Sequence, residues 1–167
     1  MLLTNRLAIE RFTVDDSEDI FELLNEPSFK QFIGDKGVAS LDDARDYLKN
    51  TPLDHYEKHG YGLFRVSLRD TGAFVGMNGL IRRPEFECPD LGFAFLKAHW
   101  SMGYAFESSV AIINYAKTTL DLDSLIALVD EDNEASVKLL AKLGFQFRQR
   151  VMMPGESVEV LQFELVT

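Results

Sequence analysis

Two small residues stand where an alternating apolar stretch gives way to a helical pattern. In HWSMGYAFES, residues 99–108, Gly103 and Ala105 lie two positions apart, shortly before the apolar run VAIINYA. The first turn of a helix has backbone N–H groups without partners, and the helix dipole makes that end positive. Small side chains would let an anion such as a phosphate reach those amides. A tight turn with close helix packing explains the same spacing, so both interpretations stand at this point.

A second polar motif follows the next apolar strand pattern. LVDEDNEASVKLLAKLGF places Asn133 after that strand, Ser136 at the start of a helical pattern and Gly144 after its end. The dinucleotide-binding fingerprint needs three glycines with an acidic residue downstream, and the P-loop needs Gly-Lys-Ser/Thr. Neither fingerprint is present in this sequence.

The elements that must position these residues are predicted from hydrophobic periodicity. Helical patterns cover 13–27, with Thr13 and Asp16 as a capping pair and Pro27 as the stop, and also 40–50, 104–120 and 134–144. Strand patterns cover 4–12, 61–69, 73–82, 90–96, 124–130, 145–153 and 158–165. This order predicts an α/β or α+β fold with a single mixed sheet and helices packed against it. The crossover from 90–96 through a helix to 124–130 makes those two strands parallel neighbours.

Composition excludes several classes of protein. The 167 residues with 46% hydrophobic content predict one globular domain spanning 1–167. No apolar run is long enough for a membrane span, no secretory signal is recognisable, and the lone Cys88 favours a reducing cytoplasm. A net charge of −10 argues against nucleic acid as a partner. It suits a cationic acceptor such as an amine, and it equally serves solubility.

The two motifs together resemble the GNAT acetyltransferases, in particular the ribosomal-protein N-terminal (RimJ/RimL-like) branch. That branch carries a loop like yWGkGyA-tE and a segment like eNxaSxxlleklGF, which read HWSMGYAFES and DNEASVKLLAKLGF here. TNRLAIERFTVDDSEDIFELLNEP and GYGLFRVSLRDTGAFVGMNGL also resemble its first strand and helix and its central hairpin. The resemblance implies a mixed, mostly antiparallel seven-stranded sheet with helices on both faces. Its central parallel strand pair is splayed to hold acetyl-CoA.

The resemblance also implies which residues hold acetyl-CoA. The pyrophosphate is expected on the backbone amides of the junction loop and helix start, and the pantetheine arm on the backbone of strand 90–96 as an added strand. Asn133 and Ser136 are expected to contact the cofactor or tie the loop. The implied cofactor residues are Phe93, Ala94, Phe95, Leu96, Ser101, Met102, Gly103, Tyr104, Ala105, Asn133 and Ser136. Ser101 stands where the branch usually has glycine, and it adds a hydroxyl donor.

The implied reaction is acetyl transfer from acetyl-CoA to a primary amine by direct attack. Asp90 is the first candidate for the general base, because it opens strand 90–96 beside the expected cleft, and Glu87 is the second. An exposed loop carboxylate is an equally good interpretation of Asp90. Leu140 stands where many family members have a tyrosine, so the proton for the thiolate comes from another residue, from water or from no general acid. The alternative function is an acetyl-CoA-binding sensor or scaffold without turnover.

The remaining expectations concern metals and partners. His55 and His59 have the i, i+4 spacing of two metal ligands, but no third ligand is in register, so no metal is expected. The expected acceptor is a protein N-terminus or a small amine. No nucleic acid or membrane partner is expected, and a homodimer is the assembly common in the family.

Overall fold

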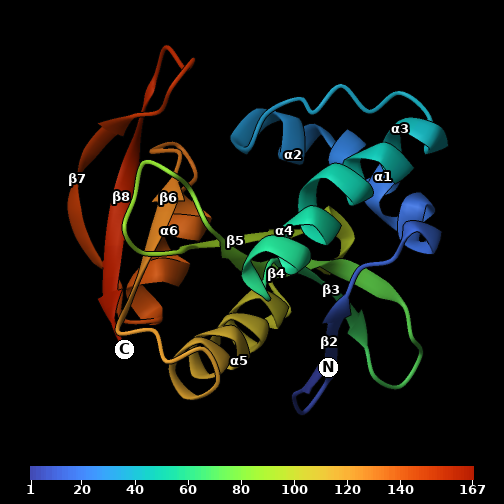
Figure 1. The fold of residues 1–167 in the computed structure, drawn as a ribbon, viewed down its shortest axis with the longest axis horizontal. Coiled ribbons are helices and arrows are strands. Elements are labelled where there is room, and N and C mark those ends of the chain that lie inside the picture. Colours follow the sequence, from blue (N-terminus) through green and yellow to red (C-terminus); the bar gives the residue numbers. More distant parts are fainter.

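The computed structural model describes residues 1 to 167, and its strands form one mixed sheet (Figure 1). The order across the sheet is β1-β2-β3-β4-β5-β6-β8-β7. The strands are β1 (Leu2–Leu3), β2 (Leu7–Arg11), β3 (Leu63–Leu68), β4 (Phe74–Ile81), β5 (Asp90–Phe95), β6 (Ser124–Val129), β7 (Gln146–Met152) and β8 (Glu159–Val166). The pair β5–β6 is parallel, and every other neighbouring pair is antiparallel. The predicted parallel pair at the centre of a mostly antiparallel sheet is therefore confirmed.

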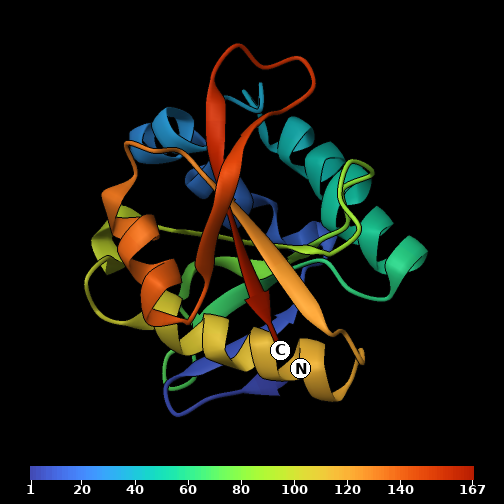
Figure 2. The same ribbon diagram turned by 90° about the vertical axis from the view of Figure 1, so that its left-hand side faces the viewer.

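Helices cover both faces of this sheet, as predicted. They are α1 (Ser17–Asn25), α2 (Pro27–Phe32), α3 (Leu41–Leu48), α4 (Asp54–His59), α5 (Tyr104–Thr118) and α6 (Glu134–Lys142). Short 3₁₀ turns lie at Val14–Asp16 and Lys97–His99, and a π-helical segment at Lys49–Leu53 joins α3 to α4. The helices α3 and α4 lie across the sheet from α5 and α6 (Figure 2). None of the helices is both long and apolar enough to cross a membrane.

Two apolar cores separate along the two faces. Ile112 and Ala116 of α5 and Leu140 of α6 are fully buried in one cluster with side chains from most of the strands. Residues of α1, α2 and α3 form the second cluster with Ala94 and Leu96. Because side chains alternate along a strand, β5 contributes Leu91 and Phe95 to the first core and Ala94 to the second. Strand β5 is therefore fixed from both sides.

The predicted strand number of seven is wrong by one. The eighth strand is β1, whose two residues pair with β2 in the register Leu2↔Ile9 and Leu3↔Ala8. A turn brings these two strands together, and a hydrogen bond from the Thr4 N–H to the Leu7 carbonyl at 2.9 Å closes it. A two-residue strand has too little alternation to be recognised in the sequence.

The interpretation of Pro27 as a simple helix stop also needs correction. Helix α1 does end before it, but Pro27 is the first residue of α2. That position suits proline because the first N–H of a helix has no intrahelical partner to lose. The predicted start of α3 is confirmed, since the Ser40 hydroxyl accepts a hydrogen bond from the Asp43 N–H at 3.1 Å.

Candidate active site

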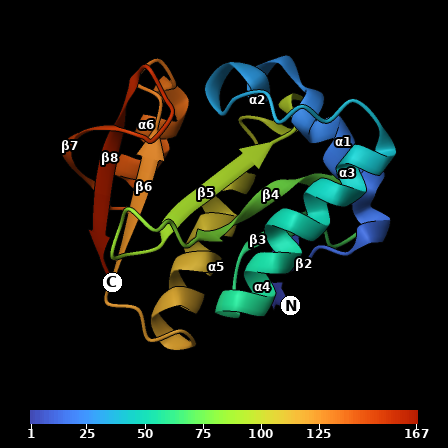
Figure 3. The ribbon, with the colours of Figure 1, turned by 45° about the horizontal axis from the view of Figure 1, so that its top comes forward.

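The central parallel strands join at one end and separate beyond it (Figure 3). Their register contains a single pair, Asp90↔Ile126, and the Ile126 N–H donates to the Pro89 carbonyl at 2.9 Å. Two residues further along β6, the Leu128 N–H donates to Asp90 Oδ1 at 3.2 Å. The carboxylate of Asp90 is the acceptor here, in place of a backbone carbonyl of β5. The strands diverge from this point, and the backbone of β5 faces an open gap.

The edge of β5 that faces this gap follows from its hydrogen bonds. The Leu96 N–H donates to the Val75 carbonyl, so residues of the same parity face β4. The backbone groups of Phe93 and Phe95 therefore face the gap. Trp100 Nε1 donates to the Phe95 carbonyl at 2.8 Å and occupies that acceptor. Both polar groups of Phe93 and the N–H of Phe95 remain on the open edge.

A cleft of about 470 Å³ adjoins this edge. Its walls come from α2, from β5, from the junction loop (residues 99–103) with the start of α5, and from one face of α6. The residues that line it are Ser28, Phe29, Phe32, Ile33, Phe93, Ala94, Phe95, His99, Trp100, Ser101, Gly103, Tyr104, Ala105, Phe106, Asn133, Ala135, Ser136, Lys138, Leu139 and Lys142. Nine of the eleven expected cofactor residues are in this set, and the other two, Leu96 and Met102, are not.

The junction loop beside this cleft has backbone amides without partners. Ser101 and Gly103 both have left-handed backbones, with φ of 61° and 82°, and α5 begins at Tyr104. The N–H groups of Ser101, Met102 and Gly103 donate to no acceptor in the chain. The amides of the first helical turn have no intrahelical acceptors either. The N–H groups of residues 101–105, which we call the amide cradle, together with the positive end of α5 can hold an anion.

The left-handed backbone at Ser101 gives a first prediction, for the variant Ser101→Gly. A β-carbon is unfavourable at positive φ, whereas glycine is not, so the variant is expected to be more stable by about 0.5 to 1 kcal/mol. For a chain of this size, that corresponds to a rise of about 1 to 4 °C in Tm. Ser101→Ala, which keeps the β-carbon and removes the hydroxyl, is the matched control. A Tm in the glycine variant at or below that of the native chain would contradict the prediction.

Asn133 is held at the start of α6 with one of its polar groups free. Its Oδ1 accepts a hydrogen bond from the Ser136 N–H at 3.2 Å, which makes Asn133 the N-cap of that helix. Its Nδ2 has no partner in the chain, and the residue lines the cleft. Asn133 thus caps the start of α6 and also provides a free N–H donor on the cleft wall.

The two candidate carboxylates lie outside the cleft lining. Asp90 is 2% exposed, and its Oδ2 accepts from Arg83 Nε at 2.7 Å. Burial raises the pKa of the Asp90 carboxyl, while Arg83 and the Leu128 N–H oppose this by stabilising the ionised form. Glu87 is exposed, and its carbonyl accepts from Arg82 Nη1. Both oxygens of Asp90 are therefore engaged, and its assignment as a base stays a prediction.

The last helix does not place a tyrosine on the cleft wall. Leu140, which aligns with the tyrosine of many family members, is buried in the core and does not line the cleft. Its neighbour Leu139 does line it. Leucines therefore stand both on the cleft wall and at the aligned position, so the proton for the leaving thiolate does not come from a tyrosine of this helix.

Several residues at the site carried no recognisable signal in the sequence. Arg6 contacts the junction loop, Glu107 pairs with Arg6, and Arg83 pairs with Asp90. Each depends on partners brought together by folding. The two histidines of α4 have ring centroids 4.7 Å apart, and His55 Nε2 accepts a hydrogen bond from the Arg82 N–H. No group of three or more His, Cys, Asp or Glu side chains has a geometry that could hold a metal ion.

The separated strands and the amide cradle place free backbone groups of a strand edge and a site for an anion in one cleft. The family model described as "Acetyltransferase (GNAT) domain" matches residues 6–146, which is most of the chain. The chain belongs to the GNAT acetyltransferase family. It is therefore an acyltransferase, and family membership implies acetyl transfer from acetyl-CoA.

Individual relatives cover nearly the whole chain. An uncharacterised N-acetyltransferase, YoaA of Bacillus subtilis, is 28% identical over 99% of this chain and 96% of its own length. A putative ribosomal-protein-serine acetyltransferase from Vibrio cholerae has 23% identity and a TM-score of 0.81 over 99% of this chain and 96% of that one. The spermidine N-acetyltransferase from Vibrio cholerae, in complex with CoA and spermine, has 17% identity and a TM-score of 0.80 over 98% and 96%. The two structures share the fold with this chain.

Proposed function

We propose that the protein transfers an acetyl group from acetyl-CoA to a primary amine. The observation that carries this proposal is the continuity of the amide cradle with the open edge of β5 in one cleft. The pyrophosphate would lie on the amides of residues 101–105 at the positive end of α5. The pantetheine arm would pair with the free backbone groups of Phe93 and Phe95 as an added strand. Asn133 Nδ2 would donate to the cofactor from the facing wall.

The proposed chemistry is direct attack without a covalent acetyl-enzyme. The neutral amine nitrogen attacks the thioester carbonyl, and the carbon–sulfur bond then breaks. The nitrogen loses a proton, and the departing thiolate gains one. Because Leu140 stands in place of the tyrosine of many family members, we propose that water delivers that proton. The base role of Asp90, or of Glu87 in second place, remains part of this proposal, and the Asp90 variants described in the Discussion test it.

The proposed acceptor is a cationic molecule whose amine can lose its proton at the site. The net charge of −10 attracts such molecules to the protein. Relatives of the same fold are named for ribosomal-protein and polyamine acetylation. Protein N-termini and small polyamines are therefore the first acceptors to test. The aromatic residues Phe29 and Phe32 of α2 line the cleft and would contact an acceptor that enters beside that helix.

The proposed location is the cytoplasm, where acetyl-CoA is abundant and thiols stay reduced. Cys88 is the only cysteine, and its Sγ lies 2.8 Å from the Ser124 hydroxyl. Homodimerisation also remains a prediction. Strand β7 forms an edge of the sheet and is exposed along most of its length.

An acceptor screen tests the proposed function. The purified chain and acetyl-CoA are incubated with N-terminal peptides, polyamines, amino acids and aminoglycosides, and release of the CoA thiol is measured with mass analysis of the acceptor. Thiol release that depends on one class of amine is the expected result. Binding of acetyl-CoA without turnover on any amine would favour the sensor or scaffold function. Failure to bind acetyl-CoA would overturn the proposal.

A further inference from the structure

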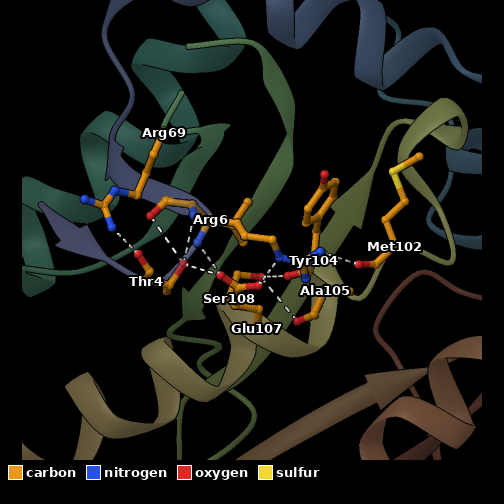
Figure 4. Close-up of polar contacts among 9 residues, drawn as sticks. Thr4, Arg6, Arg69, Met102, Tyr104, Ala105, Glu107 and Ser108 are labelled. Atoms are coloured by element: carbon orange, nitrogen blue, oxygen red, sulfur yellow. Dashed lines mark hydrogen bonds and ion pairs between the residues drawn. The ribbon is translucent and has the colours of Figure 1, made fainter. Parts of the chain in front are cut away.

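An arginine from the N-terminal segment contacts the loop that carries the amide cradle. Arg6 precedes β2, yet its Nη1 donates to the Met102 carbonyl at 2.9 Å (Figure 4). Its guanidinium carbon lies 4.6 Å from the centre of the Tyr104 ring. A β-carbon on Gly103 would lie 3.3 Å from its Nη2. Arg6 therefore contacts three consecutive residues of the cradle.

Glu107, in the first turn of α5, fixes the position of this arginine. Its Oε2 accepts from Arg6 Nε at 2.7 Å, and its Oε1 accepts from the Arg6 backbone N–H at 2.8 Å and from the Thr4 hydroxyl at 2.6 Å. Burial raises the pKa of Glu107, but the hydrogen bonds from Thr4 and Arg6 outweigh it and lower the pKa. The stabilisation from this ion pair is therefore complete above the ordinary glutamate pKa of about 4.3 and is lost as the pH falls through the lowered value.

The bond from Arg6 to the Met102 carbonyl determines which way the next amide points. In a trans peptide the C=O and the following N–H point in opposite directions. Because the Met102 carbonyl points toward Arg6, the Gly103 N–H points away from it. Gly103 lies between the cleft and a hollow on the Arg6 side that Arg6 also lines, so we infer that an N–H directed away from Arg6 faces the cleft. Without Arg6, the peptide between Met102 and Gly103 could rotate, because glycine restrains its backbone least.

We propose that Arg6 is a positioning residue for the pyrophosphate of acetyl-CoA. It holds the Met102–Gly103 peptide so that the Gly103 N–H faces the phosphate, and it acts through the loop without touching the reacting thioester. Glu107 and Thr4 hold Arg6 in turn. The inference rests on the proposed function, because the anion in the cradle is taken to be the cofactor's pyrophosphate.

The test compares two acetyl donors, acetyl-CoA and acetyl-pantetheine, which lacks the diphosphate. Arg6→Ala is expected to raise KM for acetyl-CoA about ten- to hundredfold, with kcat at saturation within about twofold of the native value. Its kcat/KM with acetyl-pantetheine is expected to be unchanged. Arg6→Lys is expected to recover part of the affinity, since lysine restores the charge without the planar fork that reaches both Glu107 and Met102.

The matched control is Arg69→Ala. Arg69 Nη1 donates to the Thr4 carbonyl at 2.7 Å, so it stabilises the same N-terminal segment but does not contact the junction loop (Figure 4). This variant is expected to keep the native KM for acetyl-CoA. If Arg6→Ala proves too unstable to purify, Glu107→Gln should give a smaller rise in KM for acetyl-CoA, again without a change in kcat/KM for acetyl-pantetheine.

Three outcomes would overturn the role of Arg6. They are an unchanged KM for acetyl-CoA in folded Arg6→Ala, an equal loss with both donors, and a fall in kcat at saturation without a change in KM. Failure of the proposed function is separate, because the native chain would then either bind no acetyl-CoA or bind it without turnover on any amine. Titration calorimetry of the native and Arg6→Ala chains with CoA distinguishes the two cases, because it measures cofactor binding without turnover.

Discussion

Replacing Gly103 with glutamate is expected to abolish acetyl-CoA binding. The residue has a φ of 82°, and its β-carbon would lie 3.3 Å from Arg6 Nη2, so any side chain strains the loop. A carboxylate at this position would also place a negative charge beside the cradle, where it would repel the pyrophosphate and could draw Arg6 away from the Met102 carbonyl. The native chain at a hundred times its Kd should gain about 2.7 kcal/mol of stability from the cofactor, and the variant should gain none. A thermal shift series with acetyl-CoA measures both.

Gly155→Glu is the control for this substitution. Gly155 also has positive φ, at 78°, but it lies in the turn between β7 and β8, and a β-carbon there would meet nothing within 4 Å. The control carries the backbone strain and the added charge without altering the cradle. It should therefore melt at a lower temperature and keep the full shift with acetyl-CoA. If Gly103→Glu shows the same thermal shift with acetyl-CoA as the native chain, the pyrophosphate does not bind at this loop.

Replacing Asp90 with alanine is expected to destabilise the protein at the point where β5 and β6 separate. It is also expected to lower turnover at least tenfold. The change removes the acceptor of the Leu128 N–H and the partner of Arg83. Breaking a buried ion pair costs about 3 to 5 kcal/mol, and the lower end is expected here because the Arg83 side chain is 34% exposed. Denaturant unfolding gives the change in stability, and thiol release gives the change in kcat.

Asp90→Asn distinguishes the two roles of this residue. The asparagine side chain can still accept from the Leu128 N–H, but it cannot take a proton from the acceptor amine. If Asp90 is the general base, kcat should fall by about 10² to 10⁴ and its dependence on pH should change. If Asp90 serves to position the strands, most of the turnover should remain. Glu87→Gln, at an exposed site, should then retain native activity, and a large loss there would identify Glu87 as the base.

Much of the fold was predictable because its signals are local. The alternation in 61–69 and 73–82 and the Ser40 cap each depend on a few neighbouring residues, and the parallel pair β5–β6 follows from the order of three consecutive elements. The elements that escaped prediction have weak or ambiguous local signals. The strand β1 is two residues long, and a proline at position 27 is compatible with either the end of a helix or the start of one.

The candidate site likewise contains residues that the sequence predicted and residues that it did not. The small residues of the junction loop and Asn133 were recognisable because family resemblance resides in short motifs. Arg6 and Glu107 were not, because they are 101 residues apart in the sequence and nothing near either one indicates the other. The engagement of Asp90 by Leu128 and Arg83 was equally hidden, since it depends on where the two strands part.

The single backbone pairing between β5 and β6 has a mechanical consequence. Strands β1 to β5 and strands β6, β8 and β7 form two plates, and the seam between them holds only at the Asp90 end. A cofactor lying along the open part of that seam would add hydrogen bonds to the β5 edge and fill the space between the plates. The bound cofactor would thereby act as part of the sheet. The protein without it would be the more flexible form, and its two plates would move about the Asp90 end of the seam.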